Sequence, residues 1–550
     1  MLQKTASRSI PTNTRLLTAQ NLSILALFSL IYFATVLLRA SEKYFWFDEL
    51  GTVNISRLPN MNAVWQTIRH GMDYNPPLFW VLTRLAGAPF GFGLISARLP
   101  EMIGFWVACI CLFAIAARRF GSTCGVIAML FPLVTAAKYY AYEARPHGIV
   151  LGFAAIAALA WQEAHESRRR VIWLVVLGAS LTAADLTHPY AVMLYMPLGL
   201  AELYRTTRTR RLDWGVLCSI GISGLVAAPF LIYIVRIYRE VVDTAATNFP
   251  PVSHATVFSF FQFLLEPATL VIIVCLALFA VSHLLRKKTA PVPLEGNSNL
   301  MSCDVALALS FLAMPLFALT LAFVTKGPFV DRYLLSTVIG VALLVAFGAA
   351  RFDGSKWVPL TIATILACSL VIDPLRVLKH RLAGVGEVLF EPSTLLRLST
   401  TPGNPMAPHD ALRAAEQSAL PIVVMSSMDY AFLFEYALPQ MKSRFWYVSP
   451  DATELIGRIL RLERQWCGQA YNLDYTRNFL AGNHRLFLYG RPPELFSFLS
   501  LNNQVQVHSI LSRTDSSTDA HFLLDAEIKN NDDPGLAGAK NKGPYEHTMH

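Results

Sequence analysis

The chain has 550 residues, of which 54% are hydrophobic and only 15% are charged. A soluble protein carries about 25% charged residues, so this composition excludes an ordinary soluble enzyme. It also excludes a disordered chain and a fibrous repeat, and it indicates a polytopic membrane protein. The formal net charge of +9 fits a bias of basic loops in such a protein, and no nucleic-acid partner is expected.

Apolar runs long enough to approach a bilayer's thickness recur along the first two thirds of the chain. The first, Leu22–Leu38, follows a polar leader, but it is long for a signal peptide and lacks a convincing cleavage site, so we interpret it as a retained span. The other runs are Ile95–Ala117, Cys124–Ala137, Pro146–Trp161, Val171–Leu186, Tyr190–Tyr204, Trp214–Val235, Pro267–Leu285, Cys303–Val324, Tyr333–Ala350 and Trp357–Ile372. The fold class predicted is a polytopic α-helical membrane protein with about 11 transmembrane helices.

The orientation is predicted from the basic residues between these runs, because cytoplasmic loops carry an excess of Lys and Arg. Basic clusters such as Arg118-Arg119, Arg168–Arg170 and Arg208–Arg211 fall on the same side as the N-terminus. The N-terminus is therefore placed in the cytoplasm, and an odd number of spans places the C-terminal part outside.

The sequence divides into three predicted regions. Residues 1–373 form the transmembrane domain, whose first outer loop (39–94) contains short interfacial helices at Asn62–His70 and Pro77–Ala86. Residues 374–528 form an extracytoplasmic α/β domain, and the polar residues 529–550 form a disordered tail. In the second region predicted strands alternate with predicted helices, which favours a partly parallel sheet. The strands are Pro421–Ser426, Arg444–Val448 and His484–Tyr489, and the helices are Ala411–Ser418, Asp429–Ala437 and Thr453–Gln465.

Two adjacent carboxylates, Asp48 and Glu49, follow an aromatic cluster just beyond the first span. Carboxylates at such a boundary can act as a general base or hold a divalent metal. On a helix they would point about 100° apart, so one could face a reacting group and the other a metal or a supporting partner. The alternative is a solvated pair at the end of a helix.

A second candidate site is the stretch Lys138–His147, which contains Tyr142 and Arg145. Pro146 suits the first turn of the next span, so Arg145 would lie at a helix N-terminus on the outer face. Backbone N–H groups, the helix dipole and the guanidinium would then favour a phosphate. The alternative is that Lys138 and Arg145 extend toward lipid headgroups.

Three further motifs lie at predicted outer ends of spans. Arg332 belongs to the cationic loop Lys326–Tyr333 and could instead pair with Asp331. His188 lies in Thr-His-Pro-Tyr and could contact substrate or metal, or could be a structural histidine. Asn75 lies in Asn-Pro-Pro-Leu, where the proline pair could simply start a helix. The candidate contacts to substrate or metal are His188, Asn75 and Tyr142.

All these candidates fall on one predicted side of the membrane. Cations can bind a phosphate and a carboxylate can accept a proton, so the set suits a phosphate-containing lipid substrate. A transporter would instead place ionisable groups near the middle of the bilayer, where these spans carry few.

The order of the motifs resembles a known family. Phe-Asp-Glu (47–49), Asn-Pro-Pro-Leu (75–78), Ala-Arg-Leu-Pro (97–100), Glu-Ala-Arg-Pro-His (143–147), Thr-His-Pro-Tyr (187–190) and Asp-Arg-Tyr-Leu (331–334) follow the first span in turn. The series resembles the type C membrane glycosyltransferases, in the bacterial branch related to protein O-mannosyltransferases and to the lipid A aminoarabinose transferase. It covers Leu22 to Ile372, with His147 where many relatives have Tyr.

The resemblance implies a multi-pass protein of the bacterial inner membrane that transfers a sugar, with inversion, from a polyprenyl-phosphate donor at the outer face. The acceptor hydroxyl would belong to a glycolipid, a polysaccharide or a protein. It implies that Asp48 is the base, that Glu49 supports it or a metal, and that Lys138, Arg145 and Arg332 hold the donor phosphate. A divalent cation, which some relatives use, is an open cofactor, and Asp48 and Glu49 are its candidate ligands. The alternatives are a lipid-linked-sugar flippase or transporter and a non-catalytic assembly protein.

Overall fold

The fold is that of a computed structural model, which describes residues 18–242, 253–285, 298–325, 329–350, 357–382, 412, 415, 418–436, 439–449, 455–513 and 521–529. The chain forms two compact units. The helical unit comprises Met1–Ser41, Tyr74–Arg236 and Phe249–Lys379, and the α/β unit comprises Glu42–Asp73, Ile237–Asn248 and His380–His550. Of the predicted tail only Lys529 is among the described residues, and the predicted domain boundaries remain predictions.

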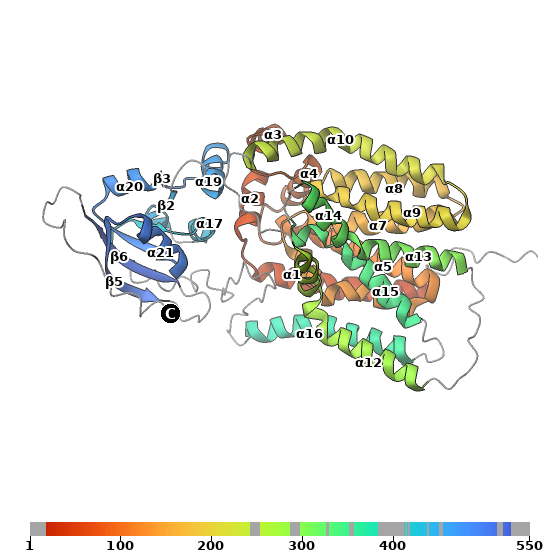
Figure 1. Cartoon of the computed structure of the whole chain (residues 1–550). Coiled ribbons are helices and arrows are strands. Elements are labelled where there is room, and N and C mark those ends of the chain that lie inside the picture. The colour runs from red at the N-terminus through yellow and green to blue at the C-terminus, as the bar shows by residue number, and fades with distance from the viewer. Residues whose placement is uncertain are drawn as a thin grey trace, which may run out of the picture. The chain divides into compact units, whose positions relative to one another are not determined.

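The described residues of the helical unit form helices joined by short turns (Figure 1). The α-helices are α1 (Ala19–Glu42), α4 (Pro77–Gly87), α5 (Leu99–Phe120), α6 (Ser122–Leu130), α7 (His147–Glu166), α8 (Arg170–Asp185), α9 (Tyr195–Thr209), α10 (Trp214–Val242), α11 (His254–Leu265), α12 (Thr269–Leu285), α13 (Ser298–Leu312), α14 (Met314–Thr325), α15 (Thr337–Ala350) and α16 (Trp357–Leu382). Short 3-10 helices lie between them: η2 (Ser96–Arg98), η3 (Phe131–Val134), η4 (Ala136–Tyr142), η5 (Pro189–Leu194), η6 (Glu266–Ala268) and η7 (Asp331–Leu334).

Each of the apolar runs singled out in the sequence overlaps a helix of this unit. Among the described residues, five helices are long and apolar enough to cross a membrane, or up to seven if two bent pairs each count as one span. The larger bend, 79°, separates Ser122–Val134 from Ala136–Tyr142, where the Thr135 side chain accepts the Ala137 N–H and so caps a new helix. The polytopic helical fold is therefore confirmed, while the number of 11 spans stays a prediction.

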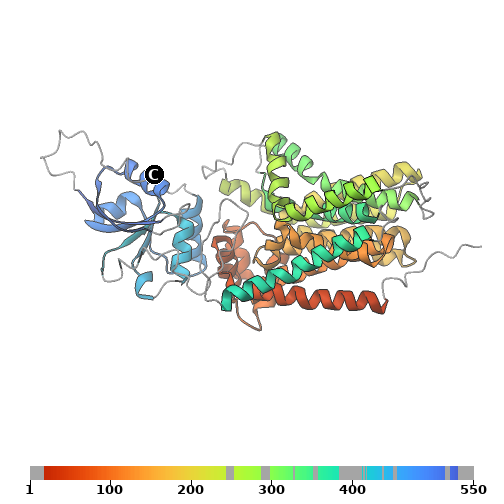
Figure 2. The ribbon, with the colours of Figure 1, turned by 90° about the horizontal axis from the view of Figure 1, so that it is seen from below.

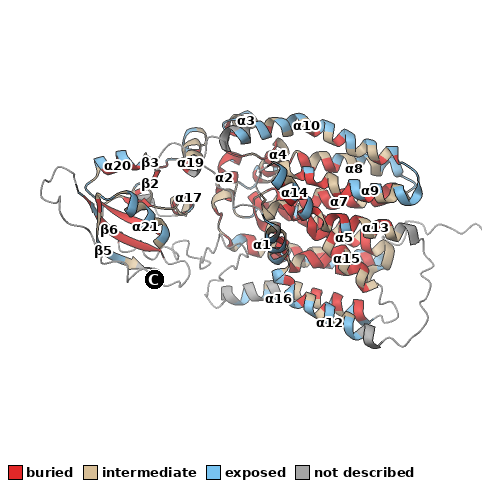
Figure 3. Cartoon of the chain, in the orientation of Figure 1, coloured by how far each residue is buried: buried red, intermediate tan, exposed pale blue. Residues whose placement is uncertain are grey.

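Large apolar side chains are exposed on the outer helices of this unit (Figure 3). They include Leu27 and Leu30 on α1, Val171 and Val175 on α8, Leu225 and Ile232 on α10, Leu270 and Leu276 on α12, and Trp357 and Leu360 on α16. Figure 2 shows α1 and α16 running lengthwise at the edge of the helix bundle. An apolar exterior of this extent suits contact with lipid rather than with water.

Helices α5 and α7 pack closely because glycines line their contact. A Cβ atom at Gly104 would lie 2.6 Å from the Gly148 carbonyl oxygen, and one at Gly148 would lie 2.7 Å from the Tyr140 carbonyl oxygen and 2.8 Å from that of Glu101. Small residues at such positions let two membrane helices approach backbone to backbone. This contact sets the position of the start of α7, which is His147.

The buried Arg98 holds the ends of α1 and α5 together. Its side chain is fully buried, and Nη1 donates a hydrogen bond of 2.8 Å to the Ala40 carbonyl oxygen. In addition, the Tyr32 hydroxyl of α1 donates to the Met102 carbonyl oxygen of α5 at 2.9 Å. The arginine of the Ala-Arg-Leu-Pro motif is thus a structural residue.

The α/β unit contains a six-stranded sheet in the order β3-β2-β1-β4-β6-β5. Strands β3, β2, β1 and β4 are parallel, whereas β6 is antiparallel to both β4 and β5. The strands are β1 (Ile422–Val424), β2 (Phe445–Ser449), β3 (Leu473–Tyr475), β4 (Arg485–Gly490), β5 (Val505–Arg513) and β6 (Phe522–Ile528), and the helices between them are α17 (Ser427–Tyr436), α18 (Pro439–Lys442), α19 (Leu455–Trp466), α20 (Thr476–Gly482) and α21 (Pro492–Leu501). The partly parallel α/β domain is therefore confirmed; β3, β5 and β6 were not anticipated.

The segment between α1 and α4 contributes two helices to the α/β unit, α2 (Phe47–Ser56) and α3 (Met61–Arg69). The Asn60 side chain caps α3 by accepting the Ala63 N–H at 2.9 Å. The predicted helix at 62–70 corresponds to α3, and the one at 77–86 corresponds to α4 of the helical unit.

Gly148→Ala tests the contact between α5 and α7. Because the added methyl group meets backbone oxygens that cannot rotate away, we expect a loss of about 1–3 kcal/mol in stability and a lower thermal midpoint in detergent. Gly199→Ala on α9, where a Cβ meets nothing within 4 Å, is the control and should unfold no earlier than wild type. Equal midpoints for both variants would contradict the proposed packing.

Candidate active site

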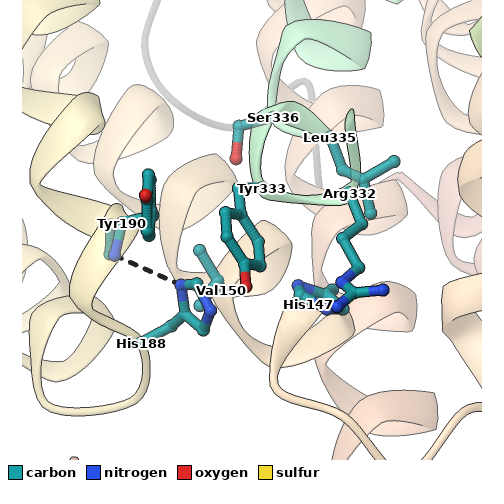
Figure 4. A pocket seen from close by; sticks show the side chains of 9 residues that line it. His147, Val150, His188, Tyr190, Arg332, Tyr333, Leu335 and Ser336 are labelled. Atoms are coloured by element: carbon teal, nitrogen blue, oxygen red, sulfur yellow. Dashed lines mark hydrogen bonds between the residues drawn. The ribbon is translucent and has the colours of Figure 1, made fainter. Parts of the chain in front are cut away.

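A small pocket in the helical unit, here called the histidine pocket, is formed by three separate segments (Figure 4). They are the start of α7, the turn before η5 together with η5, and the segment from η7 to α15. Its lining residues are His147, Val150, His188, Tyr190, Ala191, Arg332, Tyr333, Leu335 and Ser336.

Two prolines place the histidines. Pro146 is the N-cap residue of α7, so His147 is the first residue of that helix. His188 has extended backbone dihedrals, with φ −153° and ψ 133°, and Pro189 begins η5 directly after it. A proline disfavours helical geometry in the residue before it and suits the first turn of a helix, which explains both local structures.

Aromatic rings pack around the histidines in this pocket. The His188 ring centroid lies 4.7 Å from that of Tyr333 and 5.4 Å from that of His147. The rings of Tyr190 and Tyr333 lie 4.4 Å apart. Figure 4 shows Tyr333 between His188 and Arg332, so three motifs distant in the sequence meet at one place.

His188 is held in a neutral form with a defined tautomer. Burial lowers its pKa to about 3, and the positive charges of Arg145 and Arg332 contribute to the shift. The Tyr190 N–H lies 3.2 Å from Nδ1, which must accept it. The remaining ring nitrogen, Nε2, therefore carries the hydrogen and is a donor.

His147 supplies a second buried polar group. Its side chain is 5% exposed, and its Nε2 has no hydrogen-bond partner among the described residues. A buried polar atom without a partner costs about 1–3 kcal/mol, so a ligand oxygen in the pocket would be stabilised by this nitrogen.

Three of the predicted site residues are thus brought together by the structure: Arg145, His188 and Arg332. The Arg332 guanidinium lies 5.7 Å from the Tyr333 ring centroid. The sequence did not single out His147, Tyr190, Tyr333 and Ser336 as site residues, although the first three stand in the motifs and the fourth follows one closely.

The other candidates of the helical unit have different surroundings. Lys138 lies on η4 with its ammonium 5.4 Å from the Tyr139 ring centroid, and Tyr142 is buried in the apolar core. Asn75 is buried, and its carbonyl oxygen accepts the Trp80 indole N–H at 2.9 Å. None of these three lines the histidine pocket, and their roles stay predictions.

The two carboxylates lie in the first turn of α2, in the α/β unit, and have different surroundings. Glu49 is fully buried; its Oε2 accepts the Trp46 N–H at 3.4 Å and lies 3.8 Å from the Lys43 ammonium. Asp48 is half-buried. Glu49 thus holds the start of α2, and Asp48 is the better candidate for a reacting group.

The donor set around Glu49 does not fit a divalent metal. The Lys43 ammonium already provides the positive charge beside this carboxylate, and a metal there would meet a like charge. Among the described residues no group of three or more His, Cys, Asp and Glu side chains is placed to hold a metal ion. The metal therefore remains unconfirmed.

Comparison with known proteins gives a family model that matches part of the chain, including several of these site residues. The family model for dolichyl-phosphate-mannose-protein mannosyltransferases matches residues 74–233, a region that contains Arg145, His147 and His188. No curated protein matches the chain by sequence.

Among solved structures, the chain is similar to ArnT from Cupriavidus metallidurans. The apo structure has a TM-score of 0.55 and 12% identity, and the match covers 92% of this chain and 97% of that one. The structure of the same protein bound to undecaprenyl phosphate has a TM-score of 0.53 and 15% identity, with 92% and 98% covered.

The matched family model and the shared fold agree with the ordered motifs of the sequence. Residues 74–233 thus match the mannosyltransferase family model, and the chain has the fold of ArnT.

The neutral state of His188 should make stability depend on pH. Because its pKa is lower in the folded protein than the ordinary value of about 6.5, the unfolded chain binds more protons between the two values. The stability from burying neutral His188 is present above about pH 6.5 and is lost as the pH falls, by up to about 1.4 kcal/mol per pH unit.

The measurement is the thermal midpoint at pH 7.5 and pH 5 for wild type and for His188→Gln, which keeps an acceptor and a donor but does not titrate. Wild type should lose more on acidification than the variant. A parallel decrease would show that His188 does not remain neutral.

Proposed function

We propose that the chain transfers a sugar, with inversion, from a polyprenyl-phosphate donor to an acceptor hydroxyl at the outer face of the membrane. The N-terminus is then cytoplasmic, the α/β unit is extracytoplasmic, and the membrane is the bacterial inner membrane. The observation that carries the proposal is the histidine pocket, which is lined by Arg332 and two buried imidazoles, with the charge of Arg145 acting on His188. The acceptor is a glycan, a lipid or a protein.

The pocket's chemistry fits the phosphate of such a donor. The charges of Arg145 and Arg332 both act on His188, so an anion beside this histidine would be attracted by two positive charges. Charge-assisted hydrogen bonds to phosphate oxygens are strong. The Nε2 donor of His188 and the Nε2 atom of His147 complete a polar lining, and Lys138 is a further cation for the donor.

The similarity in fold supports the same kind of ligand. The ArnT structure from Cupriavidus metallidurans that is bound to undecaprenyl phosphate shares the fold, so a polyprenyl phosphate is the donor carrier that we propose here. The exposed apolar side chains of the helical unit suit a substrate that arrives within the lipid.

In the proposed reaction the acceptor oxygen attacks the anomeric carbon on the face opposite the phosphate. The new C–O bond forms as the bond to the phosphate oxygen breaks, and the phosphate leaves with the electron pair. Arg145 and Arg332 stabilise the charge that develops on this leaving group. Asp48 accepts the proton of the attacking hydroxyl, and Glu49 holds the turn that carries Asp48.

Asp48→Asn tests the role of the base. The amide keeps the size of the side chain but cannot accept the proton, so we expect turnover to fall about 10²- to 10⁴-fold. Mass spectrometry of envelope glycans, from cells producing wild type or the variant, measures the product. Asp474→Asn, on β3, is the matched control. Wild-type product with Asp48→Asn would remove Asp48 from this role.

Arg332→Met tests the phosphate site. Loss of a charge-assisted hydrogen bond of about 1.5–3 kcal/mol should weaken binding of undecaprenyl phosphate about 10- to 100-fold. The control is Arg485→Met, because Arg485 pairs with Asp525 within the sheet of the α/β unit. Binding is measured on purified protein in detergent, and equal affinity for all three proteins would contradict the phosphate site.

One observation favours the alternative of a lipid-linked-sugar flippase. The break of 79° before η4 resembles the broken helices of transporters, and Lys138 lies on the second piece. Movement of a labelled polyprenyl-phosphate sugar across vesicles, with no new glycosidic bond, would support this function. A new glycosidic bond that depends on Asp48 would exclude it as the sole activity.

A further inference from the structure

A buried carboxylate that the proposed reaction does not use lies on α19 of the α/β unit. Glu463 is 2% exposed. Its Oε1 accepts the amide N–H of Asn54 on α2 at 3.5 Å, and it also forms a side-chain hydrogen bond with Tyr471. Gln469 donates to the Asn54 carbonyl oxygen at 2.9 Å. Both ends of the Asn54 amide are therefore held by the C-terminal part of the chain.

Glu463 also approaches the backbone of α2 at Gly51. A Cβ atom at Gly51 would lie 3.7 Å from Glu463 Oε1, an ordinary van der Waals distance. Gly51 follows Asp48 by three residues, a spacing that puts both on neighbouring positions of one helix face. The contact with Glu463 is thus made within one turn of the proposed base.

Further contacts hold the segment on both sides of α2. Before the helix, the Phe45 N–H donates to the Tyr436 hydroxyl at 2.9 Å. After it, Arg57 lies 3.8 Å from Glu435 on α17. Beyond α3, the rings of His70 and Trp466 stack at 4.1 Å. Contacts with α17 and α19 therefore hold the chain before and after α2.

We propose that Glu463, through Asn54, is a positioning residue that sets the orientation of α2 and so of Asp48. This inference rests on the proposed function, in which Asp48 is the base. It assigns the extracytoplasmic α/β unit a part in catalysis, because that unit, rather than the helical unit, holds the helix that carries the carboxylate.

The protonation of Glu463 gives this role a specific signature. Burial raises its pKa to about 7, as does the negative charge of Glu435, while hydrogen bonds from Tyr471 and Asn54 oppose the shift. Besides Glu435, Tyr471 and Cys467 are electrostatically coupled to Glu463. The elements packed here also carry the ionisable residues Asp48, Glu49, Arg57, Asp429, Arg458, Arg461 and Arg464. Because the folded pKa is the higher one, the stability from neutral Glu463 is present at low pH and is lost as the pH rises through about 7.

The first test is Glu463→Leu in the full chain. The substitution removes the acceptor of the Asn54 amide N–H. Helix α2 should then tilt, and turnover at saturating substrate should fall about 10- to 100-fold. Binding of undecaprenyl phosphate should stay at the wild-type value, because its proposed ligands lie in the helical unit. Hydrogen exchange of residues 47–56 should become faster. The matched control, Glu527→Leu on β6, removes a half-exposed carboxylate that pairs with His508 and should change none of these.

The second test is Glu463→Gln, which keeps the hydrogen-bonding shape without a titrating group. It should restore turnover at pH 7 to within about twofold of wild type, as an isosteric partner would. Wild type should lose activity between pH 7 and pH 8.5, and this variant should not.

The outcomes separate this inference from the proposed function. Wild-type turnover by Glu463→Leu, while Asp48→Asn is inactive, would overturn the positioning role alone. If Glu463→Leu fails to fold, as lost undecaprenyl phosphate binding would reveal, the pH profile of Glu463→Gln decides. A profile parallel to that of wild type between pH 7 and pH 8.5 would then overturn the proposal.

Discussion

Arg119 on α5 lies between the carboxylates of Glu166 and Asp304, and Arg118 beside it pairs with Glu163. A charge in an apolar surrounding is tolerated only when it is paired, so these contacts bind α5, α7 and α13 together at one end of the bundle. Helix α7 has 20 residues and is about 30 Å long. Fixing its C-terminal end, together with the glycine contacts to α5, leaves little freedom for His147 at its start.

At the other end of α7 the buried titratable group is a histidine, and burial there favours its uncharged form. There Arg145 and Arg332 act on His188, and burial keeps that imidazole neutral. A neutral histidine can stay near two cations, whereas a charged one would repel them. The pocket thus combines positive charge with uncharged hydrogen-bonding groups. This combination suits a phosphate, because the cations attract it and the imidazoles fix its orientation.

Each unit carries different residues of the proposed function. The helical unit carries the proposed donor site and the apolar surface for a lipid substrate, while the α/β unit carries Asp48 on α2. Buried polar side chains hold that helix, among them Glu49 at its start and Asn54 near its end. Buried polar networks tolerate little rearrangement, because each lost partner leaves an unsatisfied group. The contacts of Glu49 and Asn54 within the α/β unit would therefore orient the carboxylate of Asp48.

The sequence by itself determined the membrane class, the places of the apolar helices and the parallel core of the α/β domain, because hydrophobic periodicity and length are local properties. It also singled out Arg145, His188 and Arg332, whose motifs carry turn prolines or clustered charge, and their role as site residues stays a prediction. It did not find His147, Tyr190 and Tyr333 as pocket residues, nor Glu463, nor the strands β3, β5 and β6. Those depend on which distant segments pack together. Burial, ring contacts and the neutral state of His188 arise from neighbours far away in the chain, so only the tertiary structure could decide them.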